Sequence, residues 1–140
     1  MAQIDYTKFQ MSLERLVEQH ENYLTSNPSR STLDLEGVAE SVIQRFETCY
    51  DCLWKVLKRY LGEELAIPDT PNSPKPILKL AAENNLFDVP LDQWLDYAQA
   101  RTDTSHDYDG AKAQACLELA GHFISDAIDL LQTMTGEPWD

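Results

Sequence analysis

The chain has 140 residues, with 24 acidic against 11 basic side chains and a formal net charge of -13 at pH 7. That length is enough for one domain with its own hydrophobic core. Such acidity is unlike the basic surface of most nucleic-acid-binding proteins, so binding RNA requires a local basic patch. The most concentrated candidate is Lys55, Lys58 and Arg59, with Arg45 earlier in the same segment.

Targeting and redox signals point to the cytoplasm. No apolar run approaches the ~18 residues that suggest a membrane span. The first residues lack a basic stretch followed by an apolar one, so no signal peptide is expected. Three cysteines, an odd number, fit a reducing compartment better than a disulfide framework. We therefore expect a cytoplasmic protein with no membrane association.

Two helices are predicted in the first half of the chain. Apolar residues recur at helical spacing over residues 6–24, with Asp5 as the expected N-cap. A second apolar stripe covers residues 32–61 and predicts a long helix with a cap at Ser31 or the next residue. Gly62 is a natural stop for this second helix.

The second half of the chain also reads as helical. Residues 62–73 are predicted to form a flexible, proline-containing linker. A short helix then starts at Pro74, a fourth helix at Pro90, and a long final helix runs from an Asp109 cap to about Met134. No segment alternates like a strand. We therefore predict an all-α, up-and-down bundle of about five helices, in one domain that spans the whole chain.

Between the last two predicted helices, the segment from Arg101 to Tyr108 reads Arg-Thr-Asp-Thr-Ser-His-Asp-Tyr. Arginine carries a fixed charge with fork geometry for phosphate oxygens, and histidine transfers protons near neutral pH. This pair suits RNA cleavage, in which a 2′-hydroxyl loses a proton and a crowded phosphorane is stabilised. On one continuous helix Arg101 and His106 lie about 140° apart. We therefore expect the helix to end or distort near Ser105, leaving both side chains exposed and unimportant for stability.

The spacing Arg-x4-His-x-Tyr, here Arg101, His106 and Tyr108, resembles the motif of HEPN-domain toxins, which are partners of minimal nucleotidyltransferases. Residues 41–61 resemble the second helix of that group. More specifically, most of residues 30–135 is similar to nucleotidyltransferase substrate-binding proteins. The resemblance implies a HEPN-like bundle that acts in a two-component toxin–antitoxin system.

The resemblance also implies roles for individual residues. Arg101 is expected to bind the phosphate of RNA and His106 to move the proton in a metal-independent ribonuclease, with Thr102 and Ser105 as supporting residues. The nucleotidyltransferase is expected to neutralise this toxin by transferring AMP to Tyr108. Composite sites near a two-fold axis imply a homodimer, and no cofactor is expected.

Other readings of the same residues stay open. The family usually has Asn where this chain has Thr102, and a hydroxyl reaches less far than an amide. The alternative function is therefore a non-catalytic subunit that recruits the nucleotidyltransferase or presents its substrate. If these residues have no role in a site, His106 instead places a cation at a helix C-terminus, where the helix dipole favours it, and Tyr108 is an aromatic residue that packs against the last helix.

Two short motifs do not predict sites. Asp107 and Asp109 match the middle of an EF-hand loop, but Cys116 stands where the bidentate Glu belongs, so no metal site is predicted. Redox dithiols lie at a helix N-terminus, where the thiolate is stabilised. Cys49 and Cys52 lie in the middle of a predicted helix, and we interpret them as structural thiols.

Overall fold

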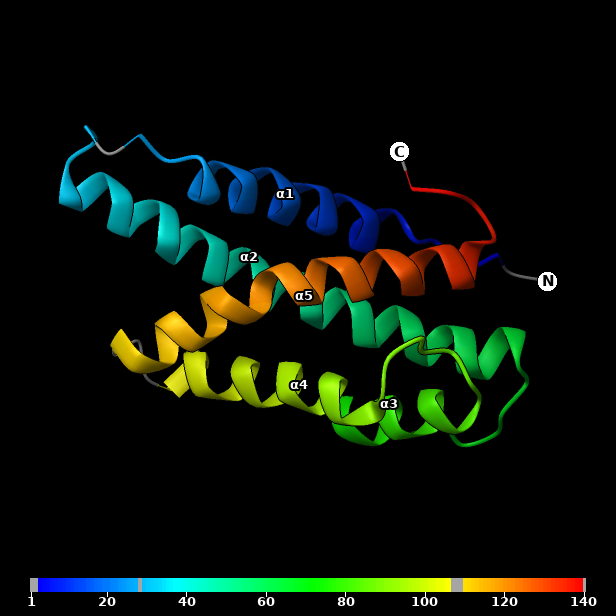
Figure 1. The fold of residues 1–140 in the computed structure, drawn as a ribbon. Coiled ribbons are helices and arrows are strands. Elements are labelled where there is room, and N and C mark those ends of the chain that lie inside the picture. Colours follow the sequence, from blue (N-terminus) through cyan, green and yellow to red (C-terminus); the bar gives the residue numbers. More distant parts are fainter. Residues whose placement is uncertain (1–2, 28, 107–109, 140) are drawn as a thin grey trace.

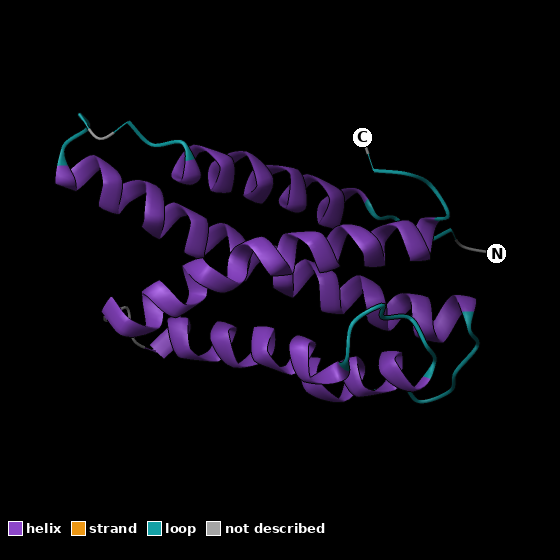
Figure 2. Cartoon of the chain, in the orientation of Figure 1, coloured by secondary structure: helices purple, strands orange, loops and turns teal. Residues whose placement is uncertain are grey.

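The computed structural model describes residues 3–27, 29–106 and 110–139, with the backbone alone described for residues 105 and 106. Within these ranges the chain forms five α-helices and one π-helical turn, without any strand. The elements are α1 (Thr7–Leu24), α2 (Thr32–Arg59), η1 (Tyr60–Glu64), α3 (Pro74–Glu83), α4 (Leu91–His106) and α5 (Gly110–Thr135). Successive long helices α1, α2, α4 and α5 alternate in direction, with the short α3 beside α4 (Figures 1 and 2). The predicted all-α bundle is confirmed.

Local hydrogen bonds fix where several helices begin and end. Ser31 Oγ accepts the Asp34 N–H at 3.1 Å, which confirms the predicted cap of α2. Asp5 Oδ1 accepts the first N–H of α1 at 2.9 Å. At the other end of the chain Gly136 has a φ of 73°, a left-handed conformation that favours glycine. Its N–H donates to the Gln132 carbonyl at 2.8 Å and ends α5.

Gly62 does not stop the second helix, contrary to the sequence prediction. The α-helix passes after Arg59 into the π turn η1, and the Leu65 N–H donates to the Tyr60 carbonyl at 3.2 Å. Leu61 lies within this turn and is fully buried. Burying a leucine stabilises by roughly 1.5–3 kcal/mol, whereas a helical glycine costs about 1 kcal/mol, so the helical path continues.

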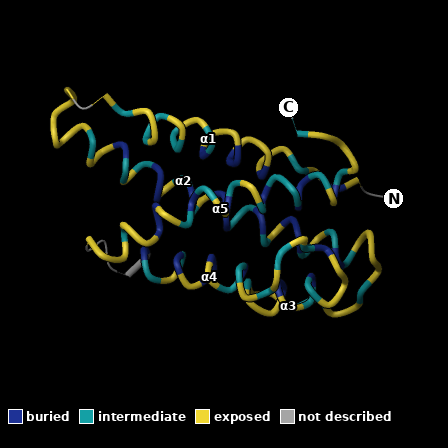
Figure 3. Tube along the Cα trace, in the orientation of Figure 1, coloured by how far each residue is buried: buried dark blue, intermediate teal, exposed yellow. Residues whose placement is uncertain are grey.

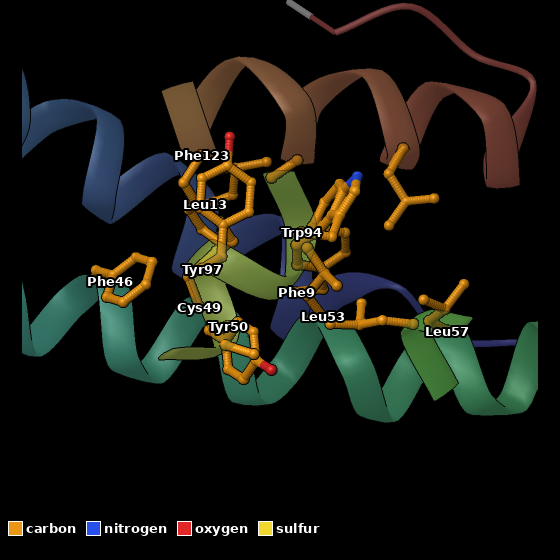
Figure 4. Close-up of a cluster of buried hydrophobic side chains, with 14 of the residues drawn as sticks. Phe9, Leu13, Phe46, Cys49, Tyr50, Leu53, Leu57, Trp94, Tyr97 and Phe123 are labelled. Carbon is orange, nitrogen blue, oxygen red and sulfur yellow. The ribbon is translucent and has the colours of Figure 1, made fainter. Parts of the chain in front are cut away.

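The apolar face of α2 is the centre of the hydrophobic core, and α2 packs against each of the other helices. Its buried residues are Val38, Val42, Ile43, Phe46, Cys49, Tyr50, Leu53, Val56 and Leu57. Phe123 of α5 packs edge-on against Phe46, with ring centroids 4.9 Å apart, and against Tyr97 of α4 at 5.3 Å (Figure 4). Along the long helices, buried positions recur between exposed ones (Figure 3).

Two expected burial positions differ from the structure. Leu24, expected on the inner face of the first helix, is 66% exposed at the end of α1. Tyr97, which is not part of the apolar spacing of Leu91, Trp94, Leu95 and Ala98 on the fourth helix, is fully buried. Its hydroxyl accepts from Gln93 Nε2 at 2.9 Å and donates to Asp126. Tyrosine can be buried here because its polar end has partners.

The helices of the described part of the chain include none that is both long enough and apolar enough to cross a lipid bilayer.

Candidate functional site

Arg101 of α4 faces α2 and bridges two of its carboxylates. The guanidinium Nη1 lies 3.1 Å from Glu47 Oε2, while Nη2 and Nε lie 3.1 and 3.3 Å from the two oxygens of Asp51. The side chain of Arg101 is 28% exposed and that of Glu47 only 14%. The arginine is therefore held in a fixed direction by charge-assisted hydrogen bonds rather than extended into solvent.

Thr104 completes this group of side chains, which we call the Arg101 network (Arg101, Thr104, Glu47 and Asp51). The Thr104 hydroxyl lies 2.9 Å from Glu47 Oε2, and Thr104 is 1% exposed. Sequence reasoning missed both carboxylate partners of Arg101, Glu47 and Asp51. The available signal was the one-turn spacing of Glu47 and Asp51 on a flank of α2, but such a pair does not stand out in so acidic a chain.

The structure places Arg101 and His106 on one helix. α4 runs to His106, within one residue of the helix end expected near Ser105. Positions 101 and 106 are then about 140° apart around the axis of α4. The hydrogen bond between Thr104 and Glu47 fastens the last turn of α4 to α2. The side chains of Ser105 and His106, and the whole of Tyr108, lie outside the described residues.

Thr102, the residue where the family usually has Asn, is exposed on α4. Its hydroxyl donates to the Ala98 carbonyl at 3.2 Å, one turn back on the same helix. The hydroxyl of this expected supporting residue is therefore bonded to the backbone of its own helix, α4.

A hollow of about 400 Å³ opens beside Arg101, and we call it the α2–α4 hollow. It lies between α2, the start of α3 and α4. Its lining is Tyr50, Asp51, Trp54, Lys55, Pro74, Lys75, Ala98, Arg101 and Thr102. Three basic side chains and an indole surround a single carboxylate, which is a composition suited to an anion that also carries an aromatic group.

Tyr50 adds a polar group to this hollow. The residue is 1% exposed, and its phenol oxygen has no hydrogen-bond partner among the residues described. In Figure 4 the hydroxyl points away from Trp94 and Phe123. Burial, and to a smaller extent Asp51, raise the pKa of Tyr50 well above its ordinary value, so the phenol stays protonated and able to donate.

The cysteines fit the interpretation as structural thiols. Cys49 and Cys116 are buried, and burial raises the pKa of each thiol to about 12. Thiols with such pKa values are protonated and unreactive at neutral pH. Among the described residues, no group of three His, Cys, Asp or Glu side chains is arranged to hold a metal ion. Asp107 and Asp109 lie outside them.

Comparison with known proteins identifies the family. The family model described as nucleotidyltransferase substrate binding protein like matches residues 4–136. The chain belongs to this family. A curated relative of this member, the probable ribonuclease HepT of Haemophilus influenzae, is 29% identical over 127 residues, which cover 88% of this chain and 84% of the relative. The family expected from the sequence is confirmed.

Two solved structures resemble this family member. A protein from Thermus thermophilus has a TM-score of 0.72 and 25% identity, over 89% of this chain and 99% of that protein. A Haemophilus influenzae protein, described as revealing the fold of a substrate binding domain of a nucleotidyltransferase, has a TM-score of 0.83 and 23% identity. That alignment covers 93% of this chain and 98% of the other, and it shows a shared fold.

The Arg101 network changes the stability expected for one variant. Arg101→Ala leaves the mostly buried Glu47 carboxylate without its guanidinium, so we expect the free energy of unfolding to fall by about 1–2 kcal/mol. Arg59→Ala is the control. It removes a salt bridge to Glu63 in which both side chains are about 40% exposed, and it should cost less than about 0.5 kcal/mol. Urea denaturation measures both values.

A second substitution separates the network from general packing. Adding Glu47→Gln to Arg101→Ala removes the unpaired carboxylate and should recover part of the lost stability. Equal unfolding free energies for Arg101→Ala and Arg59→Ala would contradict a stabilising role for the network.

Proposed function

We propose that this family member is the toxin half of a two-component toxin–antitoxin system, a metal-independent ribonuclease that works with a minimal nucleotidyltransferase. The observation that carries the proposal is Arg101, held in the wall of the α2–α4 hollow and five residues before His106. The relative named as a probable ribonuclease supports the activity, and the family's description supports the partner.

In this proposal Arg101 stabilises the phosphate and His106 moves the proton. The 2′-hydroxyl of RNA gives its proton to the imidazole, its oxygen attacks phosphorus, and the 5′-oxygen leaves and takes up a proton. Glu47 and Asp51 hold the guanidinium in place before substrate arrives, which avoids reorganisation during the reaction. Thr102 and Ser105 are proposed as supporting residues on the last turns of α4.

We further propose that the working form is a homodimer. Positions 101 and 106 are about 140° apart on one helix, so one copy directs them to different sides of α4. Two copies related by a two-fold axis can bring Arg101 of one protomer near His106 of its partner. This geometry supports a composite site more directly than a site within one chain.

Tyr108 is proposed to be the site at which the nucleotidyltransferase acts. The phenol oxygen would attack the α-phosphorus of ATP and release pyrophosphate, while a base of the partner takes the phenol proton. Because a phenol has a pKa near 10, it needs that base to react at neutral pH. The added phosphate would then compete with RNA for Arg101.

A second candidate function is a non-catalytic subunit that recruits the nucleotidyltransferase or presents its substrate. Two observations favour it. Arg101 is bound by two carboxylates, which oppose the approach of phosphate, and the Thr102 hydroxyl donates to the backbone of α4. In this case the partner binds but no RNA is cleaved.

The dimer is tested by light scattering at micromolar concentration. A homodimer should give twice the 16.0 kDa mass of one chain. A mass of one chain across the micromolar range would argue against composite sites.

The ribonuclease is tested with purified protein, RNA and a metal chelator. His106→Ala should slow cleavage by at least about 100-fold, because the proton carrier is lost. Arg101→Lys keeps the charge without the fork geometry and should also lose most of its activity. The control is His122→Ala, which changes an exposed histidine on α5 and should cleave normally. Wild-type cleavage by His106→Ala would reject the site, and an inactive wild type would favour the second candidate.

The modification is tested by incubating the chain with its cognate nucleotidyltransferase, ATP and Mg²⁺. Peptide mass spectrometry should find AMP on Tyr108, and Tyr108→Phe should stay unmodified. Tyr60→Phe is the control and should be modified like the wild type. AMP found on another tyrosine would disprove the acceptor assignment while leaving the partnership intact.

A further inference from the structure

We propose that a basic groove along α2 binds single-stranded RNA and leads it to Arg101. The inference rests on the proposed ribonuclease function and adds the path that its substrate follows. The α2 groove consists of three adjoining hollows: an outer hollow of about 550 Å³ and a middle hollow of about 410 Å³ between α1 and α2, and the α2–α4 hollow.

The three hollows lie next to one another, because neighbouring hollows share lining side chains. Lys8, Thr48 and Cys52 line both the outer and the middle hollow. Asp51 and Lys55 line both the middle hollow and the α2–α4 hollow. A ligand that lies along this flank of α2 can therefore occupy adjoining hollows and reach the Arg101 network, whose Glu47 and Asp51 lie between Ser41 and Arg59 on the helix.

The groove collects most of the chain's basic residues. The structure describes all eleven lysines and arginines, and seven of them line the groove. Lys8, Arg15 and Arg45 lie in the outer hollow. Lys55 and Arg59 lie in the middle hollow. Lys75 and Arg101 lie in the α2–α4 hollow.

Carboxylates are scarce on the same surface, although the chain as a whole has a net charge of -13. Among the described residues, Asp5 and Asp51 are the acidic side chains that line the groove. Arg59 pairs with Glu63, and Arg101 with its α2 partners. The other five cations have no carboxylate within 4.0 Å in the described part of the chain, although Arg45 Nη1 donates to the Arg15 carbonyl at 2.8 Å. Their charges are therefore not neutralised by a nearby carboxylate.

The groove thus contains the basic patch that the overall acidity requires of an RNA-binding protein. Three of the four cations that the sequence singled out, Arg45, Lys55 and Arg59, line it. The fourth, Lys58, is one helical turn from Trp54 and Lys55 and does not line the three hollows; its Nζ donates to Thr70 Oγ1 at 3.0 Å.

The α2–α4 hollow adds groups that recognise a nucleotide rather than charge alone. Trp54 is half-buried in its wall, and Lys55 Nζ lies 6.0 Å from the centre of the indole. An indole face of this kind can stack on an unpaired base. The protonated phenol of Tyr50 can donate to a phosphate or ribose oxygen. These features favour single-stranded RNA over a purely acidic protein segment.

The length of the groove sets the length of the probe. The stretch of α2 from Ser41 to Arg59 lines it and is about 27 Å long at 1.5 Å per residue. A stacked strand rises about 3.4 Å per nucleotide, so this distance corresponds to about eight nucleotides. A fluorescently labelled single-stranded RNA of about 12 nucleotides is therefore long enough to fill it.

The test measures binding of this RNA by fluorescence anisotropy across a salt series. His106→Ala is the parent protein, so that the probe is not cut. The groove triple variant is Lys8→Gln, Arg15→Gln and Lys75→Gln. The control triple is Arg30→Gln, Lys79→Gln and Lys112→Gln, from outside the groove. Each triple removes one arginine and two lysines, so both change the net charge equally.

The groove triple should weaken binding at low salt by at least about tenfold. It should also reduce the slope of log K against log salt by about 2, because each lost phosphate contact on a single strand contributes about 0.7. The control triple should change affinity less than about threefold. Trp54→Leu should weaken binding without changing the salt slope, since stacking releases no counterions.

Several results would overturn the proposal. Equal weakening by both triples would show a general charge effect, and unchanged binding by the groove triple would exclude the groove. If the groove triple binds RNA normally but is a monomer where the parent is a dimer, or no longer binds the nucleotidyltransferase, the groove is a protein interface instead.

The same proteins distinguish failure of this inference from failure of the ribonuclease. If the groove triple weakens RNA binding but the wild type cleaves no RNA, the ribonuclease proposal is rejected and the groove proposal is retained. Conversely, the groove triple can be made in the chain that retains His106. If that protein cleaves dilute RNA at the wild-type rate, the groove proposal is rejected and the ribonuclease proposal is retained.

Discussion

The burial of one face of α2 determines where every other helix lies. Phe46 on that face packs against its α2 neighbour Tyr50 and against Phe123 of α5, and the same face packs against α1. Each large side chain buried there stabilises the fold by roughly 1.5–3 kcal/mol. This is why α2 turns this face, and no other, toward the core. The remaining flank of the helix carries Asp51 and Lys55 at the surface and the mostly buried Glu47 at its edge. The helix that organises the core therefore also supplies the charges of the candidate site.

The fold could be predicted from the sequence because apolar spacing is a local property. The stripe on the second helix and the inward positions on the last one are read directly from residues three and four apart. Gly62 was misread because the same local reading cannot weigh a glycine against the burial of Leu61 next to it. Tyr97 was missed for a similar reason, since its burial depends on Asp126, a partner 29 residues away.

The candidate site could be predicted only in part. Arg101 stood out by its spacing to His106, but the carboxylates that hold it come from α2, 50 or more residues earlier. The spacing of residues along the sequence does not indicate that Arg101 contacts Glu47 and Asp51. The consequence for chemistry is a balance: Glu47 and Asp51 fix the direction of the guanidinium, and they also reduce the positive charge that a phosphate meets. Lys55 and Lys75 in the neighbouring hollow offset that reduction.

The uneven distribution of charge gives the molecule two kinds of surface. Most basic residues line one groove, so the faces away from it are strongly acidic. Long-range repulsion disfavours contact between a polyanion and those faces, and the groove is the surface that carries most of the cations. A basic partner is attracted to the opposite surfaces. Two ligands of opposite charge can therefore be sorted to different sides of a chain of 140 residues without competing for the same contacts.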